Sequence, residues 1–220
     1  MDVTAVDKEP LTARGRRTRE RLVAAARQVF EEVGFLDARI TDIVETAGVA
    51  HGTFYTYFST KEEVFREVAT LVQHEMLAEG SAERSTGDPA RRAGDTALTA
   101  VDRIVRRIEA SNRAYLEAYA RNAKIMAVIE QVATFSPELL EMRRQLRVAY
   151  VDRSTRAIER WQAAGLADPQ LEPNYAASAL GSMVDRFAYV WLVLGGDFEF
   201  ETSVATLTRL WVQALNLRDA

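Results

Sequence analysis

One stretch of the chain, residues 34–61, constrains the fold more than any other. It opens with four apolar residues at the i, i+3, i+4, i+7 spacing of one buried helix face, namely Ile40, Ile43, Val44 and Ala47. Gly48 follows, as the residue that adopts a left-handed helix end without strain. A second short helix is predicted over residues 51–58. Two short helices around such a corner are typical of a helix-turn-helix, whose second helix enters the major groove of DNA.

The sequence of this stretch resembles the head of TetR-family transcriptional repressors. The similar segments are Gly34-Phe35, Asp42-Ile43-Val44, Ala47-Gly48-Val49, Gly52-Thr53-Phe54-Tyr55, Tyr57-Phe58 and Lys61-Glu62. The resemblance covers residues 14–75, about the first third of the chain. It implies an all-α protein with a three-helix DNA-binding head and a larger C-terminal helical bundle.

The second helix of the motif is expected to present DNA-reading side chains. Phe54 and Phe58 lie four residues apart and should point inward. By position, and in part by the resemblance, we expect base-edge contacts from His51, Tyr55 and Thr56, close backbone approach at Gly52, and phosphate contacts from Thr53, Tyr57 and Lys61. The alternative for Tyr55 and Tyr57 is that they only pack on the small domain.

The net charge of −4 is unusual for a nucleic-acid binder, but the charges are unevenly distributed. Residues 14–21 contain five arginines and one acid, so Arg17 and its neighbours are predicted to meet phosphates. The alternative is a solvated helix start. Arg39 and Thr41 are further predicted DNA contacts. Relatives usually carry Ser or Thr where Arg39 stands, and Arg39 cannot cap the helix in that way, so Asp37 or Thr41 would have to.

Helical periodicity continues to the end of the chain, and about nine helices are expected in all. We assign residues 1–13 to a disordered arm, 14–60 to the DNA-binding domain and 61–220 to a ligand-binding and dimerisation domain. Helices are predicted over 18–33, 61–79, 95–120, 122–134, 136–164, 174–194 and 202–215, with a polar linker over 80–95. Either Ser59 with Glu62 or Thr60 with Glu63 fits a capping box before the helix at 61.

Several classes of function are not favoured. The chain shows no phosphate-binding loop or nucleophile elbow, so an enzyme is not expected. It has no cysteine and only two histidines, which predicts no metal site and no cofactor. The absence of cysteine also fits a reducing cytoplasm. No uncharged apolar run is long enough to cross a membrane, and the polar first ten residues are unlike a secretory signal. We therefore predict a cytoplasmic protein.

The C-terminal region is rich in bulky side chains that could line an apolar pocket. The candidates are Tyr115, Tyr119, Asn122, Met126, Phe135, Met142, Tyr150, Met183 and Phe187. The alternative is an ordinary core, which such spacing more often marks. Asp185-Arg186 stands out in an apolar helix as a surface pair, an interface ion pair or a polar contact to a ligand.

The predicted helix at 174–194 is apolar nearly all round, so a core or a partner must cover it. With the last helix it resembles the pair that forms the four-helix dimer interface of the family. The resemblance implies interface residues Ala179, Met183, Trp191, Leu194, Leu207 and Trp211.

Together these observations predict a homodimeric repressor that leaves a palindromic operator when a small lipophilic effector displaces the helix at 61–79. A ligand-independent repressor or an architectural DNA-binding protein is the main alternative. An enzyme is less favoured because the chain carries no catalytic constellation. A protein-interaction adaptor, also less favoured, would retain no genomic DNA fragments at physiological salt.

Overall fold

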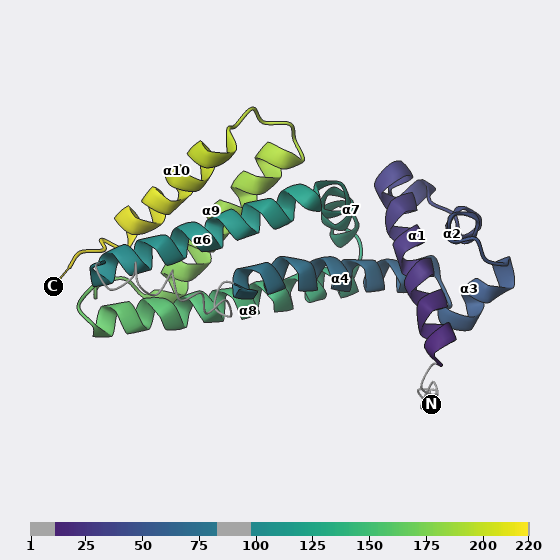
Figure 1. Ribbon diagram of the computed structural model, residues 1–220, viewed down its shortest axis with the longest axis horizontal. Helices are drawn as coiled ribbons and strands as arrows, with labels where there is room; N and C mark the ends of the chain where they lie inside the picture. Colours follow the sequence, from purple (N-terminus) through teal and green to yellow (C-terminus); the bar gives the residue numbers. More distant parts are fainter. Residues whose placement is uncertain (1–11, 83–97, 220) are drawn as a thin grey trace. The chain divides into compact units, whose positions relative to one another are not determined.

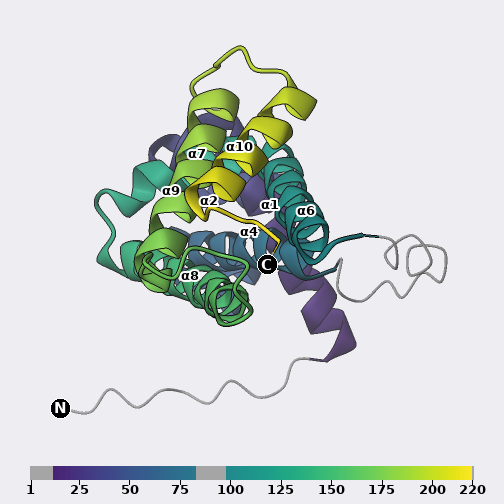
Figure 2. The ribbon, with the colours of Figure 1, turned by 90° about the vertical axis from the view of Figure 1, so that its left-hand side faces the viewer.

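A computed structural model describes residues 12–82 and 98–219, and within these ranges all regular secondary structure is helical (Figures 1 and 2). The helices are α1 (Ala13–Asp37), α2 (Ile40–Ala47), α3 (His51–Tyr57), α4 (Lys61–Ala82), α6 (Ala100–Arg121), α7 (Ala123–Ala133), α8 (Pro137–Ala163), α9 (Pro173–Leu192) and α10 (Phe200–Ala214). The all-α prediction is confirmed. The chain divides into two compact units between Leu71 and Val72, inside α4.

Two predicted irregular segments fall mostly outside the described residues. Of the expected arm, only Thr12 and Ala13 are described, and they form the start of α1. Thr12 caps this helix by accepting a hydrogen bond from the Gly15 amide at 3.1 Å, so α1 begins five residues before the predicted start at residue 18. Of the expected linker, residues 80–82 are described, and they belong to α4.

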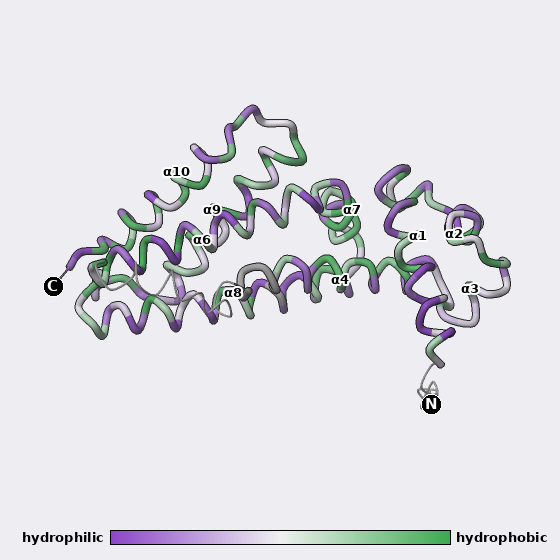
Figure 3. The backbone as a smooth tube through the Cα atoms, viewed as in Figure 1, coloured by the Kyte–Doolittle hydropathy of each residue, from purple (hydrophilic) through white to green (hydrophobic). Residues whose placement is uncertain are grey.

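The first unit is built around three phenylalanine rings. Phe65 of α4 meets the rings of Phe30 and Phe35 edge to face, with centroids 5.0 and 4.9 Å away. Gly34 allows this arrangement because its backbone, at φ 77° and ψ 175°, breaks the helical path of α1 before Phe35. The first turns of α1 form a hydrophilic segment (Figure 3).

The second unit packs α6, α8, α9 and α10 around one apolar core (Figures 1 and 2). α8 lies against α9 and α6 lies against α10, while α7 contacts α6, α8 and α9. Large side chains with no exposure at this centre include Leu116, Tyr119, Ile158 and Leu215. Ser136 and Pro137 start α8 as predicted, since the Ser136 hydroxyl accepts a hydrogen bond from the Leu139 amide.

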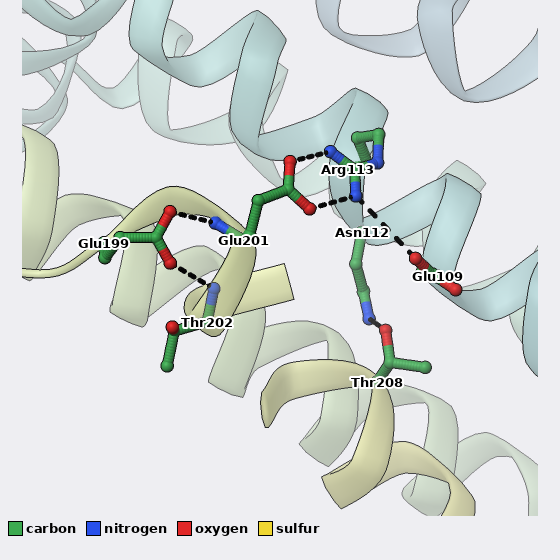
Figure 4. A network of polar contacts seen from close by, with 7 residues as sticks. All are labelled: Glu109, Asn112, Arg113, Glu199, Glu201, Thr202 and Thr208. Atoms are coloured by element: carbon green, nitrogen blue, oxygen red, sulfur yellow. Dashed lines mark hydrogen bonds and ion pairs between the residues drawn. The ribbon is translucent and has the colours of Figure 1, made fainter. Parts of the chain in front are cut away.

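Polar contacts tie α6 to α10 (Figure 4). Arg113 forms two 2.6 Å hydrogen bonds with the Glu201 carboxylate, and the Asn112 amide donates to the Thr208 hydroxyl at 3.2 Å. Glu199 accepts hydrogen bonds from the amides of Glu201 and Thr202 at 2.9 and 2.6 Å. This cap explains why α10 begins two residues before its predicted start at residue 202.

Within the described residues, none of the helices combines the length and apolarity that crossing a bilayer requires. The same residues contain no group of three or more His, Asp or Glu side chains placed to hold a metal ion.

Candidate nucleic-acid interface

The corner between α2 and α3 has the geometry that the sequence predicts. Gly48 adopts the left-handed conformation, with φ 62° and ψ 44°. Its amide donates to the Glu45 carbonyl at 3.0 Å, and the Val49 amide donates to the Val44 carbonyl at 3.0 Å, which closes the end of α2. The Arg21 guanidinium of α1 also donates to the carbonyls of Ala47 and Gly48, so α1 fixes the corner from outside the motif.

α3 has one buried face and one open face. Phe54 and Phe58 are buried. The exposed side carries His51, Gly52, Tyr55 and Thr56, while Thr53 and Tyr57 at its margins are half-buried. Tyr55 is 53% exposed, and its ring lies 5.4 Å from that of His51. This face carries aromatic and hydroxyl groups and is exposed among the described residues of the first unit, so it is suited to contact base edges.

No steric contact among the described residues requires glycine at position 52. A methyl group at its Cα would meet nothing within 4 Å. A requirement for glycine at this position would therefore have to come from a molecule that approaches α3 from outside, as the predicted close approach of DNA does.

The five arginines of residues 14–21 divide into two groups. Arg14, Arg16 and Arg17 are exposed at the start of α1. Arg19 instead pairs with Glu67 at 2.8 Å and lies over the Phe58 ring, while Arg21 holds the end of α2. Arg19 and Arg21 are therefore held by contacts within the first unit. The sequence gives no local signal for this division, because each internal partner lies at least 26 residues away.

The start of α2 is capped by Asp42, which was not one of the predicted caps. Asp42 accepts a hydrogen bond from the Arg39 amide at 3.1 Å, whereas Asp37 and Thr41 were the expected caps. The signal was available, since an acid three residues after the N-cap is the second half of a capping box. Arg39 and Thr41 are both exposed in the first unit, so their side chains are accessible to a phosphate group.

The Lys61 side chain bonds to the backbone of the first unit. Its ammonium donates to the carbonyls of Phe35, Leu36 and Ala38 at 2.7, 3.2 and 2.9 Å, and lies 4.6 Å from the Phe35 ring centroid. These carbonyls belong to the end of α1 and its connection to α2. The arrangement favours a structural role for Lys61 over the phosphate contact expected from the sequence.

In the second unit, the predicted pocket residues do not all converge. Tyr115, Tyr119 and Tyr150 lie together, with centroid distances of 6.0 Å from Tyr115 to Tyr119 and 6.4 Å from Tyr115 to Tyr150. Burial, followed by the negative charge of Asp185, raises the pKa of the Tyr115 hydroxyl well above its usual 10. Met126, Met183 and Phe187 are partly buried against the same core.

The other predicted pocket residues are in environments different from that of the tyrosine cluster. Asn122 is buried and donates to the Ala118 carbonyl at 2.8 Å, which is a helix-end contact. Phe135 is 52% exposed just after α7, and Met142 is half-buried on α8. The sequence pattern alone did not separate exposed from inward-facing bulky residues.

The predicted interface residues differ in exposure. Leu207 and Trp211 of α10 are buried in this chain's own core, so they offer little area to a partner. Trp191 is half-buried and packs against Phe187 and Phe200. Ala179 and Leu194 are exposed, and Met183 is half-buried.

Comparisons with known proteins agree with this geometry. The family model for bacterial regulatory proteins of the tetR family matches residues 22–68, and the model for the C-terminal domain of the transcriptional regulator EthR matches residues 108–216. The HTH-type transcriptional regulator TtgR of Pseudomonas putida is 26% identical over 186 residues, which cover 80% of this chain and 81% of TtgR.

A solved transcriptional regulator from Rhodococcus sp. RHA1 superposes with a TM-score of 0.68 at 25% identity, covering 91% of this chain and 99% of that one. A second regulatory protein from Rhodococcus RHA1 also has a TM-score of 0.68, at 22% identity, with 92% and 99% coverage. The chain belongs to the TetR family of transcriptional regulators, with its DNA-binding helix-turn-helix near the N-terminus.

Proposed function

We propose that the protein acts as a homodimeric repressor that a small lipophilic effector releases from a palindromic operator. The observation that carries this proposal is the coexistence of an exposed helix, α3, with an apolar face on α9 that the described residues leave exposed. The first feature is a surface for DNA, and the second is a surface for another copy of the chain.

α9 has two apolar faces. Ala177, Leu180, Val184 and Ala188 are buried and form the face toward the core. When the helix is projected at about 100° per residue, Ala179, Met183 and Val190 form a second stripe, the outer face, more than about 100° from the centre of the buried face. Leu194, two residues past the end of α9, extends this outer face and is 62% exposed, and Leu210 of α10 is also exposed. Exposed apolar side chains aligned along one helix mark an interaction surface. We therefore assign the interface to this outer face and leave out Leu207 and Trp211.

Dimerisation also meets a requirement of DNA recognition. A reading helix of seven residues contacts few bases, whereas two heads set about 34–36 Å apart read both halves of a palindrome. In each head, His51, Tyr55 and Thr56 are the proposed base contacts, with Gly52 at the groove floor. Proposed phosphate contacts come from Arg17, Arg39, Thr41, Thr53 and Tyr57. Binding to chromosomal DNA would place the protein in the cytoplasm.

The proposed effector binds the second unit. The support is the match of residues 108–216 to the C-terminal domain of EthR and the partly buried apolar side chains at the core margin. An effector can release DNA only if it binds one arrangement of the dimer more tightly than the other. Displacement of α4, which continues from the first unit into the second, is the proposed link.

The test begins with the full-length protein and sheared genomic DNA at physiological salt. Fragments retained by the wild-type protein define the operator, which should contain an inverted repeat. Tyr55→Ala should weaken operator binding by roughly 5- to 150-fold, the range expected for loss of a base contact. Tyr175→Ala is the matched control, because Tyr175 is 77% exposed on α9, far along the chain from the reading helix. Equal operator affinity in both variants would contradict the assignment of α3.

A ligand-independent repressor is the alternative. It predicts that operator affinity stays constant across a panel of hydrophobic compounds that bind the second unit in a direct assay.

A further inference from the structure

A carboxylate and three tyrosines meet where α6, α8 and α9 pack together. Asp185 of α9 accepts a 2.7 Å hydrogen bond from the hydroxyl of Tyr115 on α6. Tyr119 of α6 and Tyr150 of α8 flank Tyr115. Burial is the first cause of the raised pKa of all three hydroxyls, and the charge of Asp185 raises each of them further. The carboxylate therefore lies close enough to act on the whole cluster.

Two polar groups of this cluster have unused bonding capacity. Among the residues that the structure describes, no basic nitrogen lies within 4.0 Å of the Asp185 carboxylate. The neighbouring Arg186 lies over the ring of Tyr189 instead, 4.5 Å from its centroid. Tyr119 is fully buried, and its hydroxyl has no hydrogen-bond partner in the described part of the chain. Buried polar groups are normally satisfied, so the unpartnered Tyr119 hydroxyl, beside a half-buried carboxylate that lacks a cationic partner, points to a missing ligand.

We propose that Tyr115, Tyr119, Tyr150 and Asp185 form a site for a positively charged nitrogen carried on an apolar effector. This inference rests on the proposed function, in which an effector binds the second unit. Asp185 would supply the opposite charge and the Tyr119 hydroxyl a hydrogen-bond acceptor. The negative faces of tyrosine rings attract cations, especially quaternary ammonium groups in a desolvated site.

The surroundings of the cluster fit the apolar part of such a ligand. Met126 and Met183 are partly buried against the same core, and methionine side chains adapt to varied apolar shapes. One ring already accepts a cation, since the Arg153 guanidinium lies 5.2 Å from the Tyr150 centroid. By contrast, a ligand carboxylate at this position would be repelled by Asp185. The site therefore selects by charge as well as by apolarity.

A charge series on one alkyl chain tests this selection. Decylammonium, decan-1-ol and decanoate are titrated into the full-length protein by calorimetry, each below the concentration at which it aggregates. We expect the cation to bind at least about tenfold more tightly than the alcohol, and decanoate to bind most weakly. Asp185→Asn should reduce the preference for the cation to within about twofold. Asp152→Asn, the same change at an exposed position of α8, should keep the wild-type preference.

The series on the wild-type protein decides the question even if Asp185→Asn fails to fold. The proposal is overturned if decan-1-ol or decanoate binds as tightly as the cation, or if a folded Asp185→Asn variant keeps the cation preference. The same probes are added to the protein–operator complex to separate this inference from the proposed function. Release of DNA by decan-1-ol or decanoate without a preference for the cation supports effector control but rejects this site. A cation preference that leaves operator binding unchanged supports the site and rejects its role as the effector switch.

Discussion

Replacing Lys61 with methionine tests whether this lysine stabilises the head or touches DNA. The substitution keeps most of the apolar stem and removes the ammonium. In the folded protein that ammonium donates to three carbonyls at 2.7, 3.2 and 2.9 Å. Two of them belong to the buried residues Phe35 and Ala38, so their carbonyls would lose a donor that water can only partly replace.

The expected loss follows from these contacts. A hydrogen bond to a charged group contributes about 1.5–3 kcal/mol, but the three share one half-exposed ammonium and the freed carbonyls gain some water. We therefore expect the free energy of unfolding of the first unit to fall by about 2 kcal/mol in total rather than by the sum. For a cooperative unit of 60–100 residues this lowers Tm by roughly 8–16 °C.

Two assays separate the structural role from a phosphate contact. Thermal unfolding followed by circular dichroism measures Tm, and the salt dependence of binding to non-operator DNA counts phosphate contacts. A structural role predicts a lower Tm and an unchanged salt slope at temperatures where the variant is folded. Lys124→Met, at an exposed position of α7, is the control and should change neither. An unchanged Tm with a slope reduced by about one unit would refute the structural role and restore the phosphate contact.

Three further predictions concern the charge, the interface and the acid stability of the protein. Arg17→Ala should reduce the salt slope of DNA binding by about one unit while leaving Tm within experimental error, and an unchanged slope would count against this phosphate contact. Leu194→Asp should give monomers in sedimentation. Val148→Asp changes a similarly exposed apolar residue on α8 and should stay dimeric. A dimeric Leu194→Asp variant would reject the outer face of α9 as the interface. Hydrogen bonds from the Thr202 and Glu201 amides lower the pKa of Glu199 below its usual 4.5. The Glu199 carboxylate therefore contributes its full stabilisation of the folded state above pH 4.5, and this contribution is lost as pH falls through the lower pKa of the folded state. Glu199→Gln should therefore make Tm less dependent on pH below 4.5, and an unchanged acid profile would argue against this cap.

Local spacing in the sequence was enough to predict the reading motif. Ile43, Val44 and Ala47 repeat with the period of a helix face, and Gly48 is the residue that a left-handed helix end favours. The four-residue step from Phe54 to Phe58 fixed which side of α3 is buried. Each of these signals acts over a few residues, so no long-range information was required.

The contacts that hold the motif in place could not be predicted in the same way. Arg21 meets Ala47 and Lys61 meets Phe35, and in both cases 26 residues separate the partners. An arginine that binds phosphate and one that caps a neighbouring helix look the same in a local window. The division of the arginine cluster between solvent and internal partners therefore required the folded arrangement.

The second unit shows the same limit for apolar and charged residues. Periodicity identified an apolar face on α10, but it could not tell whether this chain's own core or a partner covers Leu207 and Trp211. Asp185 was recognisable as unusual within an apolar helix. Its hydrogen-bond partner, Tyr115, lies 70 residues earlier and became visible only when α6 and α9 were packed together.

Hydroxyl-radical footprinting of the wild-type protein on its captured operator tests most directly whether α3 reads DNA twice per assembly. We predict two protected half-sites related by two-fold symmetry, with centres about 10–10.5 base pairs apart or a multiple of that spacing. Protection should weaken at both half-sites together in Tyr55→Ala. A single protected segment, or no protection of any duplex even at low ionic strength, would contradict the account.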